Sequence, residues 1–184
     1  MDSGTNGRIN MNSRLVTLCE GAIMVAMALG LSYIKFRLFT TGGSVDAVML
    51  PLMVFALRRG AGWGVGAGVI FGTLKYFLAG GVAYTWQAML MDYTVAYAAV
   101  GLAGFFSGTP VIGVTIGAIA RYIMHILSGV VLWGEYMPDV FLGLTMTNTF
   151  VYSILYNATY MVPSYIIALV IIIPLSRAPR ILKV

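Results

Sequence analysis

Three polar side chains with the chemistry of a binding site lie inside apolar stretches of this sequence, at Asp92, His125 and Asn157. A carboxylate attracts a cation, an imidazole donates or accepts a hydrogen bond, and a carboxamide does both. Aromatic side chains that can stack on a flat ring or attract a positive charge accompany them; they are Tyr84, Trp86, Tyr93, Trp133, Tyr136 and Tyr152. This set of residue types favours a site for a planar, cationic, hydrogen-bonding small molecule.

These residues also have structural interpretations. Asp92 can form an ion pair with Arg121 or Lys75, and His125 can make a hydrogen bond between two helices. Arg121 lies deep in its apolar stretch, where we expect it to neutralise a carboxylate rather than to contact a ligand. Aromatic residues near a membrane surface commonly form an interfacial belt, which is the alternative for Tyr84, Trp86 and Tyr136.

Catalytic, metal and cofactor sites are not predicted. The chain has one histidine and dispersed carboxylates, and no serine or cysteine beside a base that would make it a nucleophile. The single Cys19 excludes an intramolecular disulfide and a cysteine metal cluster. Because the sequence has no GxxxxGK[ST] motif, any ATP hydrolysis must come from other chains. We therefore predict a protein that is not an enzyme and has no cofactor of its own.

The elements that position these residues must be membrane helices. Of the 184 residues, 60% are hydrophobic and 9% are charged, and the mean hydropathy is +0.91, so a water-facing surface of ordinary polarity cannot be assembled. The sequence predicts an all-α integral membrane protein, a compact bundle of six transmembrane helices. A polar cytoplasmic tail over 1–13 precedes a single domain over 14–184. The apolar runs cover 15–34, 47–57, 61–80, 86–106 and 110–133, with a sixth from within 140–149 to about 175.

The basic residues orient this bundle. With six spans the two termini share a side, and that side holds Arg8, Arg14, Arg58, Arg59, Arg177, Arg180 and Lys183, against Lys35 and Arg37 on the other. Loops rich in lysine and arginine stay in the cytoplasm, so both termini are predicted to be cytoplasmic. The net charge of +5 then reflects topology in lipid rather than binding to nucleic acid. In this orientation the candidate polar residues lie in the outer half of the membrane, where they face protein or a cavity.

Helical spacing agrees with an interior placement. The run 110–133 has a repeat of one residue in four whose neighbouring members share a helix face; it consists of Gly113, Gly117, Arg121, His125, Gly129 and Trp133. Asp92 shares a face with small residues that suit helix contact, namely Ala96, Ala99 and Ala103. The glycines of GWGVGAGVIFG in the third run predict a further close packing of helices.

Several ordered motifs cover most of the chain: GGSVDAVMLPLMVFALRRG, MLMDYTVAYAAVGLAGFF, RYIMHILSGVVLWGEYMP, VYSILYNATYMVPSYIIA and APRILK. In order and spacing they resemble the thiamine-specific substrate-binding subunit, or S-component, of energy-coupling factor (ECF) vitamin transporters. The resemblance implies a six-helix bundle in the bacterial cell membrane that binds thiamine from outside. It also implies delivery of thiamine through a transmembrane coupling subunit and two ATPase subunits.

The resemblance implies roles for residues of the fourth and fifth helices. Asp92 and Tyr93 match an acidic-aromatic pair whose carboxylate faces the thiazolium ring. His125 would hydrogen-bond the ligand, Gly129 would let it approach the backbone, and Trp133 would stack on its rings. Some family members carry glutamate at the position of Asp92, so the shorter side chain implies a looser or water-bridged contact.

Three further residues are implied at the ligand. Tyr152 and Asn157 match the sixth-helix pair that reads the aminopyrimidine ring, and Tyr84 matches a tyrosine in the loop before the fourth helix. Tyr152 and Asn157 are five residues apart, about 140° around an ideal helix, so spacing alone does not pair them.

The first outer loop and the first helix carry the remaining expectations. Some members place a tryptophan of this loop over the ligand, whereas FRLFTTGGS offers Phe36 and Phe39. Its glycines predict a flexible gate, formed by Gly42, Gly43 and Ser44. In the first helix the family uses a small-residue motif to bind its coupling subunit, here Ala22, Ala26 and Gly30; the spacing alone fits packing inside the bundle equally well.

Two other functions fit the same residues. One is an S-component for another vitamin or for a thiamine precursor. The other is a stand-alone secondary transporter, or a ligand-gated structural partner, that works without ATPase subunits.

Overall fold

The structure, a computed structural model, describes residues 4–37, 43–178 and 182. Its long helices are α1 (Gly4–Leu31), α2 (Met49–Arg59), α3 (Ala61–Leu78), α6 (Pro110–Val131) and α7 (Thr149–Ser176). Between α3 and α6 the chain is helical in four consecutive pieces: α4 (Trp86–Met89), the π-helix η1 (Leu90–Val95), α5 (Ala96–Val100) and the 3-10 helix η2 (Gly101–Phe106). The short elements are η3 (Gly134–Tyr136) and two antiparallel hairpins, β1 (Phe36–Arg37) with β2 (Ser44–Val45) and β3 (Val140–Phe141) with β4 (Leu144–Thr145).

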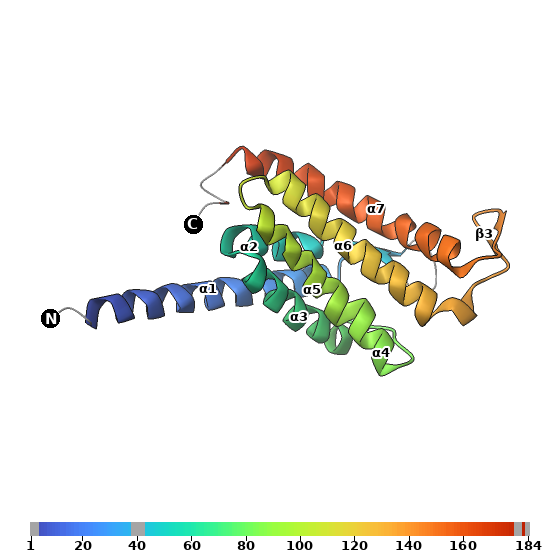
Figure 1. The fold of residues 1–184 in the computed structure, drawn as a ribbon, viewed down its shortest axis with the longest axis horizontal. Coiled ribbons are helices and arrows are strands. Elements are labelled where there is room, and N and C mark those ends of the chain that lie inside the picture. Colours follow the sequence, from blue (N-terminus) through green and yellow to red (C-terminus); the bar gives the residue numbers. More distant parts are fainter. Residues whose placement is uncertain (1–3, 38–42, 179–181, 183–184) are drawn as a thin grey trace.

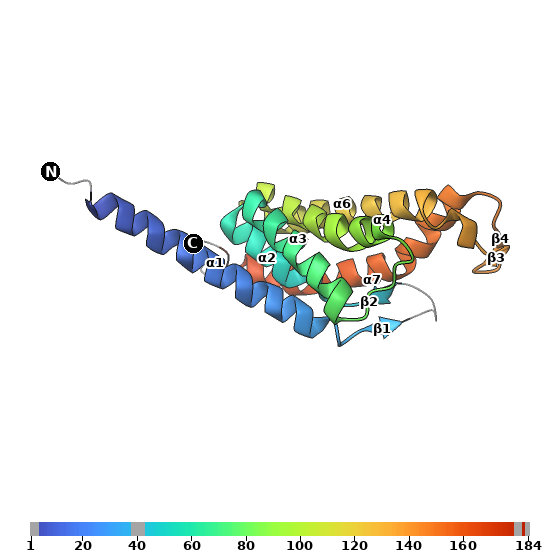
Figure 2. The same cartoon turned by 90° about the horizontal axis from the view of Figure 1, so that it is seen from below.

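The prediction of a mostly helical membrane protein is confirmed. Among the described residues, four helical segments are long and apolar enough to cross a membrane: Ser13–Leu31, Trp86–Phe106, Pro110–Val131 and Thr149–Ser176. Helix α1 begins upstream of the predicted run, because the described part of the polar tail continues the same helix from Gly4. The start of α1 and the end of α7 lie at one end of the molecule, and the β3–β4 hairpin lies at the other (Figures 1 and 2).

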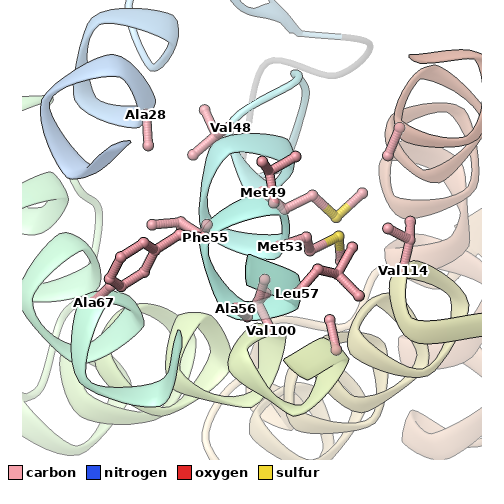
Figure 3. Packing of buried hydrophobic residues seen from close by; sticks show 14 of the residues in the cluster. Ala28, Val48, Met49, Met53, Phe55, Ala56, Leu57, Ala67, Val100 and Val114 are labelled. Carbon is pink, nitrogen blue, oxygen red and sulfur yellow. The ribbon is translucent and has the colours of Figure 1, made fainter. Parts of the chain in front are cut away.

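Helix α2 is the centre of the hydrophobic core. Every residue of α2 from Met49 to Leu57 except Leu50 is buried, as expected for a helix that is apolar on all sides. Figure 3 shows these side chains surrounded by Ala28 of α1, Ala67 of α3, Val100 of α5 and Val114 of α6. Because α2 contacts so many neighbours, it fixes their relative positions.

Glycines let α3 approach the helical segment 86–106 closely. A Cβ at Gly68 would lie 2.1 Å from the carbonyl oxygen of Tyr97, and one at Gly72 would lie 2.3 Å from that of Tyr93. No side chain fits at these distances, so the two backbones are in direct contact. The predicted close packing through the glycines of α3 is therefore confirmed.

Helices α6 and α7 run side by side along the molecule (Figure 1). The predicted face of α6 points inward, since Gly113, Gly117, Arg121 and His125 are all buried. Near the C-terminal end of α6, a Cβ at Gly129 would lie 2.1 Å from Oγ of a serine on α7. Gly129 thus allows α7 to pack closely beside the part of α6 that carries the candidate site.

Candidate functional site

A cavity of about 550 Å³ lies between α3, η1, α5, α6, α7 and the segment 43–46. All eight residues that the sequence predicted for ligand binding line it: Tyr84, Asp92, Tyr93, His125, Gly129, Trp133, Tyr152 and Asn157. The cavity therefore joins side chains from three helical segments that are far apart in the sequence. What each of them contacts in a ligand stays a prediction.

Asp92 and Tyr93 lie in η1, which is a π-helix rather than an α-helix. A π-helical turn holds an additional residue and commonly occurs at functional sites. Here it turns Asp92 toward the cavity while Ala96, at the start of α5, is fully buried against the neighbouring helices. The hydroxyl of Tyr93 accepts a hydrogen bond of 2.7 Å from the backbone N–H of Val82, which ties η1 to the loop before α4.

The carboxylate of Asp92 is held on both oxygens. The indole Nε1 of Trp133 donates to Oδ2 at 2.8 Å, and Nδ1 of His125 lies 3.3 Å from Oδ1. On its other side, His125 accepts a hydrogen bond at Nε2 from Nε of Arg121 at 3.3 Å. Because a guanidinium can only donate, Nδ1 must carry the imidazole proton and donate it to Asp92. This arrangement describes a neutral His125 that orients an ionised carboxylate.

The structural alternatives for Asp92 and Arg121 are wrong. The ammonium of Lys75 lies 3.5 Å from Oδ2 of Asp46, not beside Asp92. Arg121 is 4% exposed and donates to His125 and to the hydroxyl of Tyr97. In the described part of the chain no carboxylate lies within salt-bridge distance of Arg121. The expectation that Arg121 neutralises a carboxylate fails because the carboxylate of the facing helix bonds to the imidazole one turn away. The interhelical hydrogen bond considered for His125 is present.

Three aromatic rings form one wall of the cavity. The ring centroid of Tyr84 lies 5.3 Å from that of Trp133 and 5.4 Å from that of Tyr136. All three residues line the cavity, so Tyr84 and Tyr136 are more than interfacial belt residues. Trp86 is about as exposed as these two tyrosines, at 66%, but it lies outside the cavity lining, which fits the belt interpretation.

A further wall is a row of tyrosines on α7, of which the sequence analysis named only Tyr152. Tyr152, Tyr156 and Tyr160 follow at intervals of four, with centroids 5.6 Å and 6.0 Å apart. The signal was present in YSILYNATY, since residues four apart share a helix face. Phe141 of β3 packs edge-on against Tyr152 at 5.3 Å, so the β3–β4 hairpin contacts this wall.

Asn157 lines the cavity but its amide is engaged within the protein. Its Nδ2 donates to the backbone oxygen of Ser153 at 2.8 Å and to Oγ of Ser153 at 3.1 Å. Its Oδ1 accepts a hydrogen bond from the hydroxyl of Tyr160. With 4% of its surface exposed, Asn157 orders the tyrosine wall in this structure.

The predicted gate is described in part, because Gly42 lies outside the described residues. Gly43 and Ser44 line the cavity. The N–H of Gly43 donates to the hydroxyl of Tyr156 at 3.0 Å, and a Cβ at Gly43 would lie 2.0 Å from the ring of Tyr160. The end of the first outer loop therefore rests directly on the tyrosine wall, and only glycine fits there.

The small-residue motif of α1 faces away from the bundle. Ala22, Ala26 and Gly30 are exposed, and a Cβ at Gly30 would meet no atom within 4 Å. The bundle instead contacts the other face of α1, where Gly21 lies against the ring of Phe55. Packing of Ala22, Ala26 and Gly30 inside the bundle is therefore excluded.

Comparison with known proteins gives consistent matches along almost the whole chain. The family model described as "Thiamine transporter protein (Thia_YuaJ)" matches residues 18–183. A relative named "Thiamine transporter ThiT" from Bacillus subtilis (strain 168) is 34% identical over 194 residues, which cover 95% of this chain and 98% of the relative. A protein of the same name from Lacticaseibacillus paracasei is 28% identical over 193 residues, covering 94% and 93%.

The solved structure of ThiT from Listeria monocytogenes has the same fold. It superposes with a TM-score of 0.82 at 24% sequence identity, and the match covers 94% of this chain and 100% of that one.

Proposed function

The chain belongs to the thiamine transporter family of multi-pass bacterial membrane proteins, and we propose that it is the thiamine-binding subunit of an ECF-type importer. It captures thiamine at the outer face and delivers it inward together with a coupling module that hydrolyses ATP. The observation that carries this proposal is the carboxylate of Asp92, held by Trp133 and His125 in a cavity lined with aromatic rings.

The thiazolium ring of thiamine carries a permanent positive charge. In a cavity of low effective dielectric, a carboxylate attracts such a charge more strongly than in water. Asp92 supplies this carboxylate, and Trp133 with Tyr84 supplies ring faces for stacking and cation–π attraction. Because Asp92 bonds to a neutral imidazole and an indole, rather than to a cation, its negative charge remains for the ligand.

The aminopyrimidine ring is assigned to the tyrosine wall. Tyr152 offers a ring face and a hydroxyl there. The ring centroid of His125 lies 6.0 Å from that of Tyr160. Asn157 acts mainly by positioning these groups, because its amide already bonds to Ser153 and Tyr160. Gly43 closes over the same wall, which makes the first outer loop the gate of the site.

The proposed topology has six membrane spans with both termini in the cytoplasm. Helix α2 has 11 residues, a length of about 16 Å at ~1.5 Å per residue, and is shorter than a hydrocarbon layer of about 30 Å. The irregular segment before it lines the cavity through Gly43, Ser44 and Asp46. Non-helical backbone is tolerated at membrane depth where it faces a cavity, so this segment and α2 together complete the second span.

The exposed motif of α1 supports partnership with a coupling subunit. Small residues at intervals of four let another membrane helix approach closely, and Ala22, Ala26 and Gly30 are not used inside the bundle. The sequence carries no nucleotide-binding motif, so the two ATPase subunits must supply the energy. This surface favours the importer over a stand-alone secondary transporter.

Thiamine binding and uptake by the purified chain test these proposals separately. Calorimetric titration with thiamine should show one saturable site, and competition with the isolated pyrimidine and thiazole fragments should show weaker binding of each. A folded protein that ignores thiamine but binds another vitamin or a precursor would refute the ligand assignment. Liposomes with this chain alone should accumulate no thiamine, whereas uptake without ATPase subunits would establish the secondary transporter.

A further inference from the structure

The described lining of the cavity carries a positive net charge although the proposed ligand is a cation. Lys35, Lys75 and Arg121 contribute three positive charges, and Asp46 and Asp92 contribute two negative ones. His125 is neutral in the hydrogen-bond arrangement, since its Nε2 accepts from Arg121. A bound thiazolium would therefore raise the charge of the lining and ligand from +1 to +2. An increase of net positive charge at membrane depth is costly.

The excess of positive charge is concentrated around one phenol. Nη2 of Arg121 donates to the hydroxyl of Tyr97 at 2.9 Å, and Nζ of Lys75 donates to the same oxygen. The guanidinium carbon of Arg121 lies 4.2 Å from the ring centroid of Tyr97, and Nζ of Lys75 lies 4.9 Å from it. The two cations thus converge on a single neutral acceptor, which does not compensate their charge.

Hydrogen-bond donors also outnumber acceptors at this place. Nη1 of Arg121 is buried and has no acceptor among the described residues. The hydroxyl of Tyr97 accepts from both cations, and its own proton has no acceptor in the described part of the chain. The nearest carboxylate is Asp46, 3.5 Å from Lys75, and it also accepts from Ser44 and from the backbone N–H of Val48.

This group lies deeper in the cavity than the proposed thiazolium site. Arg121 lies one helical turn, about 6 Å, before His125 on α6, and Tyr97 follows Asp92 along the facing helical segment. Lys75, Tyr97 and Arg121 all line the same cavity as Asp92 and Trp133. One cavity therefore presents a carboxylate with aromatic rings near its mouth and cationic donors at its floor.

We propose that Lys75, Tyr97 and Arg121 form an anion subsite at the floor of the cavity, adjoining the thiazolium site. The anion is either a phosphate group carried by the ligand, as in thiamine monophosphate, or a free small anion that binds together with thiamine. Both supply the missing acceptor and reduce the net positive charge. The inference rests on the proposed thiamine site and adds a second binding group to it.

The experiment uses the full chain in detergent, with calorimetric titration at constant ionic strength. Thiamine and thiamine monophosphate are titrated in sodium chloride, sodium phosphate and sodium gluconate, because gluconate is too large for a small-anion site. The variants are Lys75→Gln and the charge-retaining Lys75→Arg, and Arg177→Gln is the matched control, which removes an equal charge from an exposed position outside the cavity.

If the floor of the cavity binds the phosphate group of the ligand, Lys75→Gln should weaken the binding of thiamine monophosphate by about tenfold or more. The same variant should weaken the binding of thiamine in gluconate by less than about threefold. If the floor instead binds a free anion, chloride or phosphate should tighten the binding of thiamine to the parent. Lys75→Gln should then abolish the dependence of thiamine affinity on the anion. In either case Lys75→Arg retains most of the effect and Arg177→Gln matches the parent.

The subsite is refuted if thiamine binding is independent of the anion and Lys75→Gln weakens both ligands by the same factor. The thermal transition of Lys75→Gln shows whether this variant folds. If it does not, the binding of thiamine and thiamine monophosphate to the parent in the three salts carries the test. A parent protein that fails to bind thiamine in every buffer would instead refute the proposed function, so the two failures are distinguishable.

Discussion

The two halves of α6 face different surroundings. In its first half, Gly113 and Gly117 lie against the carbonyl oxygens of Ala103 and Val100, in a region packed around α2 without space for a side chain. In its second half, the same face carries Arg121 and His125, hydrogen-bonded along the edge of a cavity. One helix thus joins a rigid apolar core to a polar site.

This difference explains how a carboxylate can be held in one orientation inside a membrane protein. Direct backbone contact at Gly68 and Gly72 fixes α3 against the segment that carries Asp92. The fixed segment then lets Trp133 and His125 hold the carboxylate before any ligand arrives. Preorganisation of this kind reduces the ordering cost of binding.

Gly68→Val should have the largest effect, because its Cβ would lie 2.1 Å from a backbone oxygen of the facing segment. Backbone atoms cannot move aside as a flexible side chain can, so we expect a loss of about 3 kcal/mol or more in stability. The measurement is the yield of monodisperse protein and its thermal unfolding. Gly66→Val is the matched control, since a Cβ at Gly66 meets no atom within 4 Å. Equal stability of the two variants would contradict direct backbone contact.

Trp133→Ala should leave the bundle folded but weaken thiamine binding by roughly 30-fold to 100-fold, about 2–3 kcal/mol. The variant loses both the stacking surface and the hydrogen bond to Asp92. Trp133→Phe keeps a ring without the N–H donor, and we expect an intermediate loss. The affinity is followed by calorimetry and by quenching of tryptophan fluorescence. Trp86→Ala, outside the cavity, is the control; unchanged quenching in Trp133→Ala would remove Trp133 from the site.

Gly43→Ala should weaken thiamine binding by about three- to tenfold, because its methyl group would overlap the ring of Tyr160 and hold the loop away from the tyrosine wall. The effect should appear mainly as faster dissociation of thiamine, measured by stopped-flow fluorescence. Gly108→Ala provides the control, since this loop glycine has open space around it. A dissociation rate equal to that of the parent would mean that the loop does not retain the ligand.

Ala26→Leu should have the smallest effect on thiamine affinity, which we expect to match the parent. The position is exposed on α1 and distant from the cavity lining. The bulkier side chain should instead prevent close approach of the coupling subunit, measured by co-purification of the complex and by ATP-dependent uptake. Met27→Ala, at an exposed position about 100° around α1 from Ala26, serves as the comparison. Normal assembly of Ala26→Leu would refute this docking surface.

Much of the cavity could be predicted from the sequence because helix depth and spacing are local properties. The depths of Asp92, His125 and Trp133 follow from their distances to the ends of apolar runs. Helical periodicity then indicates the inward face of α6. These two quantities suffice to place residues from separate helices in one region, even though no contact between them can be read from the sequence.

Contacts between particular side chains were harder to predict, because they depend on how each helix is rotated and bent. Arg121 was expected to bond a carboxylate, but the π-helical turn η1 presents Asp92 to His125 and Trp133 instead. The partner of Lys75 is Asp46, which lies in an irregular segment that no periodicity describes. Tyr156 and Tyr160 could have been found from their spacing. The contact between Gly43 and the ring of Tyr160, by contrast, could be found only from the structure.

The central claim is that the charge of Asp92 pairs with the positive charge of thiamine, and four affinities test it most directly. Thiamine and a neutral analogue, in which an uncharged ring replaces the thiazolium, are titrated into the parent and into Asp92→Asn. Removal of one partner from a buried charge pair costs roughly 2–5 kcal/mol. We predict that Asp92→Asn weakens thiamine by about 30-fold or more and the neutral analogue by less than about threefold, with thermal unfolding unchanged. An equal loss for both ligands, or none for either, would contradict the account.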